Sequence, residues 1–473
     1  MFTRRHSRVR RLIALALTAW LLPGAASQAS TTVVRLTSDT ARQGETAMAV
    51  SGVVPDVMVV VYTDYRSIGQ AQKNTGYAYT TDGGAAQSDW TRDLYIHGIT
   101  KSDPDSLGWM RSSDPLLVYS AKDDTFKAGG LGGTKNSAVH MTNFVFVGSS
   151  KTADAPISGL TWKSPNNVNP SLGVMLNPGS PACAGTFTDR PSMAIDNNSQ
   201  SPYYGRVYIA WQEINCGDTD VQIWTSHHDV GVTGWSDAVR VSVPDGFINE
   251  NWGPSIGAGG NNGKVYLAWC RPLAPRATCK NSMADIAIAS STDGGTSWTS
   301  PVSAACYCST VKSPLQGDSF STGSPPVLAV NPNNSNDLHI VYANFDNGSN
   351  NDAVYIHSTN GGMTWSTPII LGSGNQDQFF PHITQSADGS MLWACYYTTA
   401  FNNPRIDVSC AKSVDGVTFA NATRASTNSF DPGASGWIGD YIAAEVGGNG
   451  GYRAAWSATQ DGGVNLDVYF GRN

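Results

Sequence analysis

Acidic, arginine and tyrosine side chains stand beside several short apolar segments of this 473-residue chain. Carboxyl groups can exchange protons with a substrate, and an arginine guanidinium binds a carboxylate through paired hydrogen bonds. Tyrosine can act as a nucleophile when a base takes its proton. One set of candidates begins apolar segments: Glu45, Asp114, Asp189, Arg190, Trp252, His382, Asp440 and Tyr441. A second set follows later segments: Asp64, Glu213, Arg271 and Arg405.

The elements that must position these residues form an internal repeat. A short apolar segment, usually with a proline near its start, recurs near positions 46, 115, 191, 254, 326, 381 and 441. In most copies a second strand ending in an aromatic residue follows, as in Val207–Trp211, and then a third strand, a glycine-rich turn and a short fourth strand. Four short strands per repeat are typical of a β-propeller. We therefore predict an all-β, seven-bladed β-propeller over residues 30–473, with six blades as the alternative count.

The two ends of the repeat array predict how the propeller closes. The last repeat stops after its third strand, 466–470, while the segment 32–37 resembles the fourth strands of other repeats. We expect this N-terminal strand to complete the last blade. Such closure leaves no unpaired strand edge.

A turn motif recurs after the third strands. Residues 291–298 fit S-x-D-x-G-x-x-W, residues 358–365 repeat the motif with Asn for Asp, residues 413–419 shorten it, and residues 80–90 expand it. The Asp or Asn can bond the turn backbone, Gly supplies positive φ, and Trp can pack between blades. These turns resemble the Asp-box, or bacterial neuraminidase repeat, of the sialidase superfamily. The resemblance spans essentially the whole mature chain and implies the fold, with Asp293 and Asp415 serving structure.

The resemblance also implies a chemistry. Sialidases hold a substrate carboxylate with an arginine cluster, attack with a tyrosine that a glutamate activates, and use an aspartate as acid and base. It therefore implies catalytic roles for Tyr441, Glu213, Asp64 and Asp114. It implies substrate contacts for Arg190, Arg271, Arg405, Asp189, Asp440, Trp252 and His382. The family's F-R-I-P signature is missing, and Asp189-Arg190-Pro191 is a partial echo of it.

Three functions follow as hypotheses. The first is a secreted, exo-acting, sialidase-like glycoside hydrolase that acts on an exposed glycan or polysaccharide. The second is a non-catalytic propeller that binds carbohydrate or protein, with Trp252, Trp437 and Tyr397 stacking on sugar rings. The third is a polysaccharide lyase, in which His382 would be the base to test. Each named residue also has a plain structural reading, such as an ion pair between Arg190 and Asp189 or Asp440.

The N-terminus predicts export. Five arginines lie between residues 4 and 11, an apolar stretch covers 12–22, and Ser27-Gln28-Ala29 fits a cleavage site. We expect residues 1–29 to be a signal peptide and the mature protein to be secreted or periplasmic. The formal charge of −7 includes those five arginines and no acid from this segment, so the remainder carries −12. That charge argues against nucleic-acid or anionic-membrane partners, and we expect a monomer.

Eight cysteines suit an oxidising compartment. Cys395 and Cys410 could bridge neighbouring strands, and Cys183 and Cys216 bracket one repeat. The pairing among Cys270, Cys279, Cys306 and Cys308 stays open. We expect no cofactor and no metal site. The Asp- and Asn-rich loop 346–352 could hold calcium, although it lacks an EF-hand pattern.

Overall fold

The computed structural model describes residues 31–38, 40–66, 74–96, 111–135, 141–151, 186–215, 221–232, 234–242, 251–274, 279, 284–307, 322–345, 350–372, 376–431, 437–459 and 465–473. Residues 31–473 form one compact unit. The expected signal peptide lies outside the described residues, so its prediction stays open. Within the described residues, no helix is long and apolar enough to cross a membrane.

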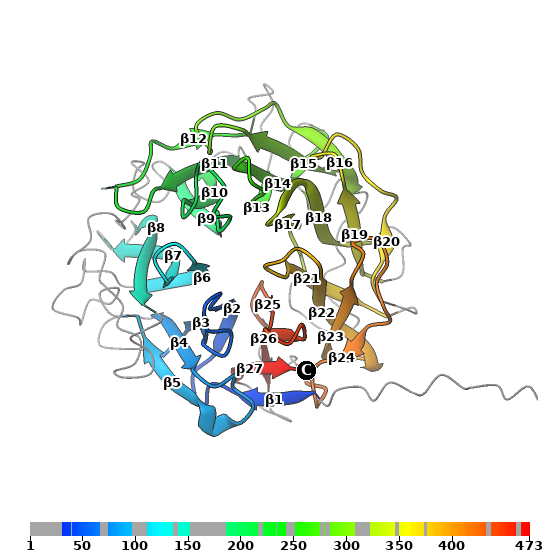
Figure 1. Ribbon diagram of the computed structural model, residues 1–473. Coiled ribbons are helices and arrows are strands. Elements are labelled where there is room, and N and C mark those ends of the chain that lie inside the picture. The colour runs from blue at the N-terminus through cyan, green and yellow to red at the C-terminus, as the bar shows by residue number, and fades with distance from the viewer. Residues whose placement is uncertain are drawn as a thin grey trace, which may run out of the picture. The chain divides into compact units, whose positions relative to one another are not determined.

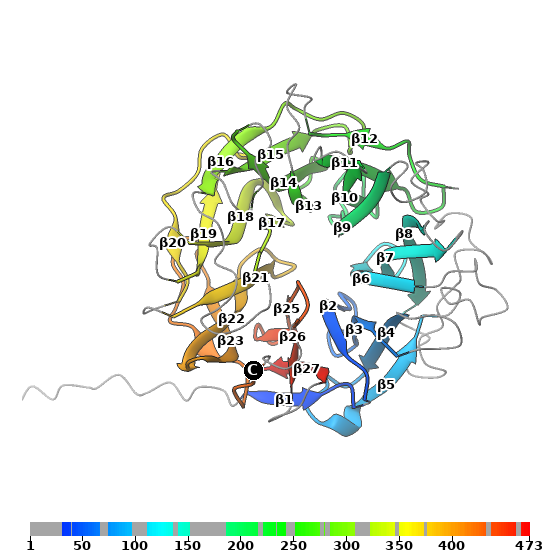
Figure 2. The same ribbon diagram turned by 180° about the vertical axis from the view of Figure 1, so that it is seen from behind.

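Antiparallel sheets surround a central axis, each with its first strand innermost (Figures 1 and 2). The first two comprise β2 (Gln43–Val50), β3 (Met58–Asp64), β4 (Asn74–Thr80) and β5 (Trp90–Tyr95), then β6 (Arg111–Ser120), β7 (Thr125–Lys135) and β8 (Met141–Lys151). The next two comprise β9 (Thr186–Ile195), β10 (Val207–Asn215), β11 (Val221–His228) and β12 (Val239–Arg240), then β13 (Trp252–Gly259), β14 (Lys264–Pro272), β15 (Ala284–Ser291) and β16 (Val302–Tyr307).

The remaining three sheets continue the ring. They comprise β17 (Val327–Asn331), β18 (Asn334–Asn344), β19 (Asp352–Ser358) and β20 (Ile369–Ile370), then β21 (Gln378–Gln385), β22 (Leu392–Asn402), β23 (Arg405–Ser413) and β24 (Thr423–Arg424), and finally β25 (Ala443–Val446), β26 (Tyr452–Thr459), β27 (Leu466–Arg472) and β1 (Thr32–Arg35). The all-β propeller is confirmed. Six complete four-stranded blades match the alternative count, whereas a complete seventh blade is not confirmed, because the β6–β7–β8 sheet has three strands among the described residues.

The N-terminal strand closes the last blade, as the sequence predicts. β1 pairs with β27 in antiparallel register, with Val34 opposite Phe470, and the two strands lie side by side in Figure 1. Val34 and Leu36 are buried in the cluster that joins this blade to β2–β4. Arg35 adds an ion pair of 2.6 Å to the buried Asp467. Both ends of the propeller therefore contribute to one sheet.

Neighbouring blades are joined by an apolar layer and by serine hydroxyls. Trp298, from the turn after β15, packs against a cluster that includes Ile223 and Val241 of the preceding blade. Near the axis, the backbone N–H of Ile256 on β13 donates to Ser192 Oγ on β9 at 3.1 Å, and that of Leu328 on β17 donates to Ser255 Oγ on β13 at 2.9 Å. These bonds satisfy strand N–H groups that have no ladder partner on the inner side.

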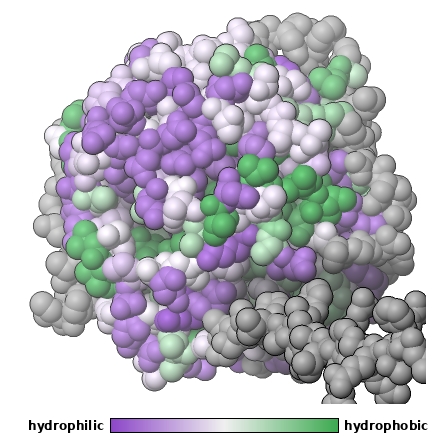
Figure 3. Space-filling model, turned by 45° about the vertical axis from the view of Figure 1, so that its right-hand side comes forward, coloured by the Kyte–Doolittle hydropathy of each residue, from purple (hydrophilic) through white to green (hydrophobic). Residues whose placement is uncertain are grey.

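The recurrent turns share one hydrogen-bond pattern. In the turn after β15, the N–H of Gly295 donates to Ser291 Oγ at 2.8 Å, and that of Ser297 donates to Asp293 Oδ1 at 2.9 Å. The turns that begin at Ser358 and Ser413 repeat both bonds with Asn360 and Asp415 as acceptors. These side chains are therefore occupied in holding their own turns. The face of the molecule seen in Figure 3 is largely hydrophilic, with several groups of hydrophobic residues on it.

Five of the seven innermost strands, β2, β6, β9, β13 and β21, have a bulge near their start. The residues with positive φ at this position, here called the bend residues, are Glu45, Asp114, Arg190, Gly253 and Phe380. A register irregularity lies at each of them, and a proline follows all but Glu45. Proline has no N–H to give to a ladder, so it suits a bulge. Positive φ in a non-glycine residue stores strain, which is common at functional sites.

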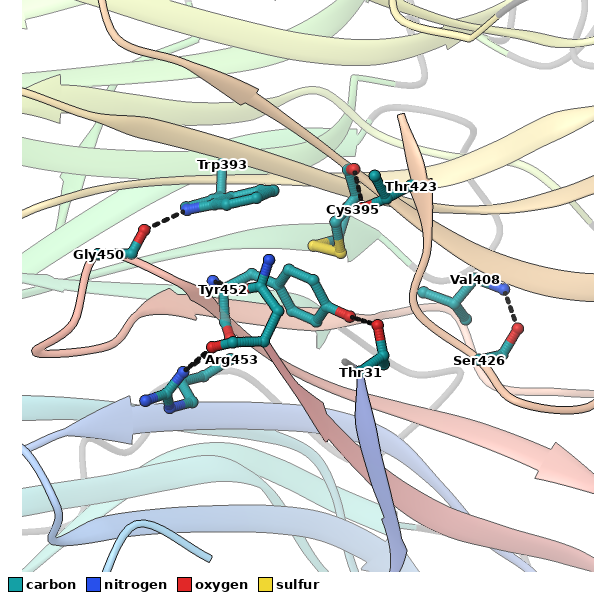
Figure 4. The surroundings of a disulfide bond; sticks show 11 residues. Thr31, Trp393, Cys395, Val408, Thr423, Ser426, Gly450, Tyr452 and Arg453 are labelled. Atoms are coloured by element: carbon teal, nitrogen blue, oxygen red, sulfur yellow. Dashed lines mark hydrogen bonds between the residues drawn. A yellow bond between two sulfur atoms is a disulfide. The ribbon is translucent and has the colours of Figure 1, made fainter. Parts of the chain in front are cut away.

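Two disulfides are present among the described residues. Cys395 on β22 and Cys410 on β23 face each other in register and form the predicted bridge (Figure 4). Beside it, Trp393 donates to the carbonyl of Gly450, and Tyr452 donates to Thr31 Oγ1 near the N-terminal strand (Figure 4). Cys270 pairs with Cys279. Cys306 is also disulfide-bonded, while Cys183, Cys216 and Cys308 lie outside the described residues, as does most of the loop 346–352.

Candidate functional site

The innermost strands enclose a central cavity of about 1100 Å³. All seven inner strands line it: β2, β6, β9, β13, β17, β21 and β25 (Figure 2). Much of the wall is apolar, while Asp114, Asp440 and Tyr441 lie at the heads of their segments. A cavity of this size exceeds the smaller pockets of about 300 Å³ that hold a single small ligand. It is therefore the place where the predicted residues could meet a substrate.

Tyr441 and Asp114 form the first contact of the site. Tyr441 precedes β25 and Asp114 is the bend residue of β6, and the Tyr441 hydroxyl donates to Asp114 Oδ2 at 3.1 Å. Both residues line the cavity. The bulge before Pro115 gives Asp114 its inward direction, because it takes the residue out of the β6–β7 ladder. The sequence placed both residues at segment starts, and the structure brings them together.

Arg190 and Asp440 form the second contact. The Arg190 guanidinium donates to Asp440 Oδ2 at 2.9 Å, and the Arg190 side chain is only 12% exposed. The same guanidinium lies over the ring of Trp252, 4.8 Å from its centroid. Arg190 is thus held between a carboxylate and an aromatic face. This confirms the structural reading in which Arg190 pairs with Asp440.

Charge crowding changes the proton affinities of this cluster. Burial, followed by the charges of Asp189 and Asp440, raises the pKa of Asp114 to about 6, although Arg190 opposes the shift. Burial and the charge of Asp114 raise the pKa of Tyr441 well above its usual value. Burial alone would lower the pKa of Arg190, but Tyr441 and the surrounding carboxylates raise it. Asp114 is therefore the group of this cluster with a proton to exchange near pH 6.

Asp189 is held by a residue that the sequence did not single out. Gln212 on β10 donates its side-chain N–H to Asp189 Oδ2 at 3.1 Å and accepts the backbone N–H of Gly253 at 3.1 Å. Gln212 thus links Asp189 to the bend of the next blade. The sequence drew attention to Glu213 instead. Because successive strand residues point to opposite faces, Glu213 faces away from the side that Gln212 uses to reach Asp189.

The structure does not bring four predicted residues into this cluster, and their roles in catalysis or binding stay predictions. Asp64 is fully buried and bound to Arg66, whose Nη2 lies 2.6 Å from Asp64 Oδ2. Arg271 forms a two-point ion pair with Asp285, at 2.9 and 2.5 Å. Arg405 donates to the Ser429 carbonyl at 2.6 Å. Asp64, Arg271, Arg405 and Glu213 do not line the central cavity. The expected arginine cluster is therefore absent from the described lining of the cavity.

The aromatic and histidine predictions have mixed outcomes. Tyr397 is completely buried and bonds the backbone of Ser457, so the prediction of an exposed stacking surface is wrong there. Trp252 is 4% exposed and stacks on Arg190. Trp437 is partly buried and packs edge-on against Tyr65 at 5.4 Å. His382 lines the cavity, and burial lowers its pKa to about 4.

Glu445 on β25 is a second residue that sequence reasoning missed. It lines the cavity and accepts a hydrogen bond from Thr384 Oγ1 at 3.2 Å. Burial raises the pKa of Glu445 to about 7. The sequence pattern gives little indication of Glu445, because this residue lies inside an apolar strand rather than at its start. Glu445 places a second titratable carboxyl group on the wall of the same cavity.

The arrangement can exchange protons and accept hydrogen bonds. Asp114 can carry a proton, and the carboxylates of Asp440 and Asp189 are held rigidly by Arg190 and Gln212. Among the described residues, no group of three or more His, Cys, Asp or Glu side chains could hold a metal ion. The chemistry open to these side chains is thus acid–base chemistry next to a fixed negative charge.

No known protein family and no curated protein matches the chain. Its structure is similar to that of a protein of unknown function from Dyadobacter fermentans, at 11% identity and a TM-score of 0.47, over 93% of this chain and 97% of that chain. It is similar to Trypanosoma rangeli sialidase in complex with the inhibitor DANA, at 11% identity and a TM-score of 0.46, over 82% of this chain and 58% of that chain.

A third similar structure is an α-L-arabinofuranosidase from Fusarium graminearum in complex with an iminosugar inhibitor, at 12% identity and a TM-score of 0.47, over 78% of this chain and 92% of that chain. Solved sialidases are thus among the structures that this chain resembles. At these identities and TM-scores the similarity assigns no activity.

Proposed function

We propose that this protein is an exported glycoside hydrolase that removes sugars from the ends of exposed glycans. The observation that carries the proposal is the hydrogen bond between Tyr441 and Asp114 beside the Arg190–Asp440 ion pair, inside a cavity large enough for a sugar chain end. Hydrolysis of a glycosidic bond needs a proton donor for the leaving oxygen and a second carboxylate nearby. This cluster contains both kinds of group.

Asp114 is the proposed proton donor. Its raised pKa of about 6 keeps part of it protonated in mildly acidic to neutral solution, as a general acid requires. The carboxylate of Asp440 is the proposed partner, because its ion pair with Arg190 fixes its position. That fixed negative charge would stabilise the positive charge that develops on a sugar ring in the transition state.

Tyr441 is proposed to position Asp114 rather than to attack the sugar. Forming a phenolate beside Asp114, Asp440 and Asp189 is costly, as the strongly raised pKa of Tyr441 indicates. As a neutral hydroxyl, Tyr441 holds Oδ2 of Asp114 and so fixes the direction of the carboxyl group. In the alternative role, Tyr441 is the nucleophile, and Asp114, rather than the predicted Glu213, takes its proton. Variants of Tyr441 and Asp114 distinguish the two roles, as the Discussion describes.

The ring of inner strands supports action on chain ends. Strands from every sheet line the cavity, so a polymer could not enter from the side. A chain end could enter along the axis. The disulfides Cys270–Cys279 and Cys395–Cys410 support export, since such bonds persist in oxidising compartments.

The test is a release assay with residues 30–473 on aryl glycosides and on oligosaccharides, beside the variant Asp114→Asn. We expect the wild type to release monosaccharide. In the variant, the rate of release should be lower by about 10²-fold or more. Binding of oligosaccharides without release would favour the non-catalytic propeller. Products that absorb in the ultraviolet would favour a lyase. Either result would overturn the hydrolase proposal.

A further inference from the structure

The described lining of the central cavity has several carboxyl groups, and the cation that pairs with one of them, Arg190 with Asp440, lies outside that lining. Its described residues include the carboxyl groups of Asp114, Asp388, Asp440 and Glu445, and they include no lysine and no arginine. The remaining wall is formed mostly by apolar residues, serines and asparagines. From this charge pattern we infer that the cavity takes an uncharged, hydroxyl-rich sugar and rejects sugars that carry a carboxylate. This inference rests on the proposed function, because it names the substrate class of the same site.

Arg190, the cation bound to a carboxylate of the lining, is already engaged by its partners. Its guanidinium is bound to Asp440 at 2.9 Å and stacked on Trp252 at 4.8 Å, with 12% of the side chain exposed. A carboxylate-bearing sugar would have to displace Asp440 from this pair. It would then lie beside Asp114 and Asp189, whose charges also act on Arg190. Like charges brought together in a partly buried cavity repel strongly, because the local dielectric is lower than that of water.

The other candidate arginines cannot relieve this repulsion where they lie. Arg271 is bound at two points by Asp285, and Arg405 donates to the carbonyl of Ser429. Neither lines the cavity. An arginine cluster that binds a carboxylate needs several guanidinium groups directed at one point. Within the described lining, that arrangement is missing.

The hydrogen-bonding character of the site matches a neutral sugar. Ionised carboxylates accept hydrogen bonds and do not donate them. A neutral sugar offers hydroxyl donors all around its ring, whereas an added carboxylate group offers only acceptors at that position. The Asp440 carboxylate therefore matches a hydroxyl donor, whereas Asp114, which already accepts from Tyr441, can donate its proton to a sugar oxygen below about pH 6. The apolar wall between the inner strands suits the C–H faces of sugar rings.

The experiment compares sugars that differ only in charge. Aryl galactoside and glucoside are paired with aryl galacturonide and glucuronide, in which a carboxylate replaces a hydroxymethyl group, and an aryl sialoside is added. Turnover is measured with the wild-type mature protein. Binding is measured by titration calorimetry with Asp114→Asn, using galactose-terminated and galacturonate-terminated oligosaccharides. We expect binding at least 10-fold tighter for the neutral member, with little dependence on salt.

The two readouts separate the two proposals. If neutral sugars bind but are not released from the substrate, the inference about substrate charge holds and the hydrolase proposal fails. Equal or tighter binding of the galacturonate-terminated ligand, release from the sialoside, or binding of neither ligand at millimolar concentration would overturn the inference. Asp440→Asn should reduce the difference in affinity between the neutral and the galacturonate-terminated ligand, because it frees Arg190 to bind an anionic group. Asp293→Asn, which changes a carboxylate of an outer turn, is the charge-matched control and should leave the preference unchanged.

Discussion

The hydroxyl of Tyr441 donates to Asp114 Oδ2 at 3.1 Å, although 327 residues separate the two along the chain. Asp114 belongs to the inner strand β6, and Tyr441 leads into β25 in the last blade. The contact therefore lies across the axis-facing surface rather than within one blade. Because the propeller closes into a ring, an aspartate near the start of the chain can form a hydrogen bond with a tyrosine near its end.

This contact makes Tyr441→Phe and Asp114→Asn a discriminating pair. If Tyr441 positions Asp114, we expect Asp114→Asn to lower kcat/KM by about 10²- to 10⁴-fold. Tyr441→Phe should lower it by roughly 10-fold, the equivalent of one neutral hydrogen bond. Steady-state kinetics on an aryl glycoside would measure both.

Equal losses in the two variants, with a covalent intermediate trapped on Tyr441 in the wild type, would instead make the tyrosine the nucleophile. Ser297→Ala, in an outer turn, is the control for expression and folding. It removes a hydroxyl that bonds Asp293 far from the cavity lining.

The activity should depend on pH through Asp114. The proton donor is present below its pKa of about 6, so kcat/KM should fall as the pH rises through about 6. Asp189 is the first charge that raises this pKa. Asp189→Asn should therefore shift the alkaline limb of the profile to lower pH. A shift in the opposite direction, or no shift, would contradict the charge coupling between the two carboxyl groups.

The stability should also depend on pH, through Glu445. Burial raises its pKa from 4.5 to about 7, so between these values the folded state holds more protons than the unfolded state. Stability from this group is therefore lost as the pH rises through that window. Glu445→Gln should be more stable than the wild type at pH 8, by at most about 3 kcal/mol, and no more stable at pH 4. Thermal unfolding at the two pH values is the measurement.

The bridge between Cys395 and Cys410 should stabilise the sixth sheet along the chain. It closes a loop with a sequence separation of 15, for which loop entropy predicts about 3 kcal/mol. The double variant Cys395→Ala/Cys410→Ala should have a free energy of unfolding lower by about that amount, measured by denaturant unfolding. Reducing agent should lower the stability of the wild type more than that of the double variant. If both respond equally, the remaining bridges carry the effect.

The N-terminal strand offers a test of ring closure. Leu36 is completely buried, next to β1. Leu36→Ala should cost about 2 to 5 kcal/mol, as other buried leucine truncations do. Thr32→Ala, at the partly exposed start of β1, should change stability by less than about 0.5 kcal/mol. Denaturant unfolding of both variants compares them. Equal stabilities would show that β1 contributes little to closure.

Part of this site could be read from the sequence, because the same positions recur in each repeat. The proline near the start of the inner strand marks the bend of the backbone at Asp114, Arg190 and Phe380. The short segment 32–37 predicted closure because its pattern matched the other outermost strands. Periodicity and turn residues report local conformation well.

Partners across strands could not be read in this way. Nothing in the sequence indicates that Arg271 is neutralised by Asp285, because register, not spacing, sets that pair. The same holds for Gln212, whose role depends on which face of β10 meets Asp189. Glu445 was missed because its neighbours along the chain are apolar, whereas its partner Thr384 comes from the adjacent inner strand.

The bend residues have a consequence for how this protein can change. Each one departs from the ladder before the inner strand resumes its pairing, so its side chain is not opposite a residue of the neighbouring strand. Asp114, Arg190 and Phe380 hold the same structural position with an acid, a base and an aromatic ring. The fold thus places different chemical groups at equivalent positions of the inner strands. A few substitutions at these positions could give the same fold a different ligand.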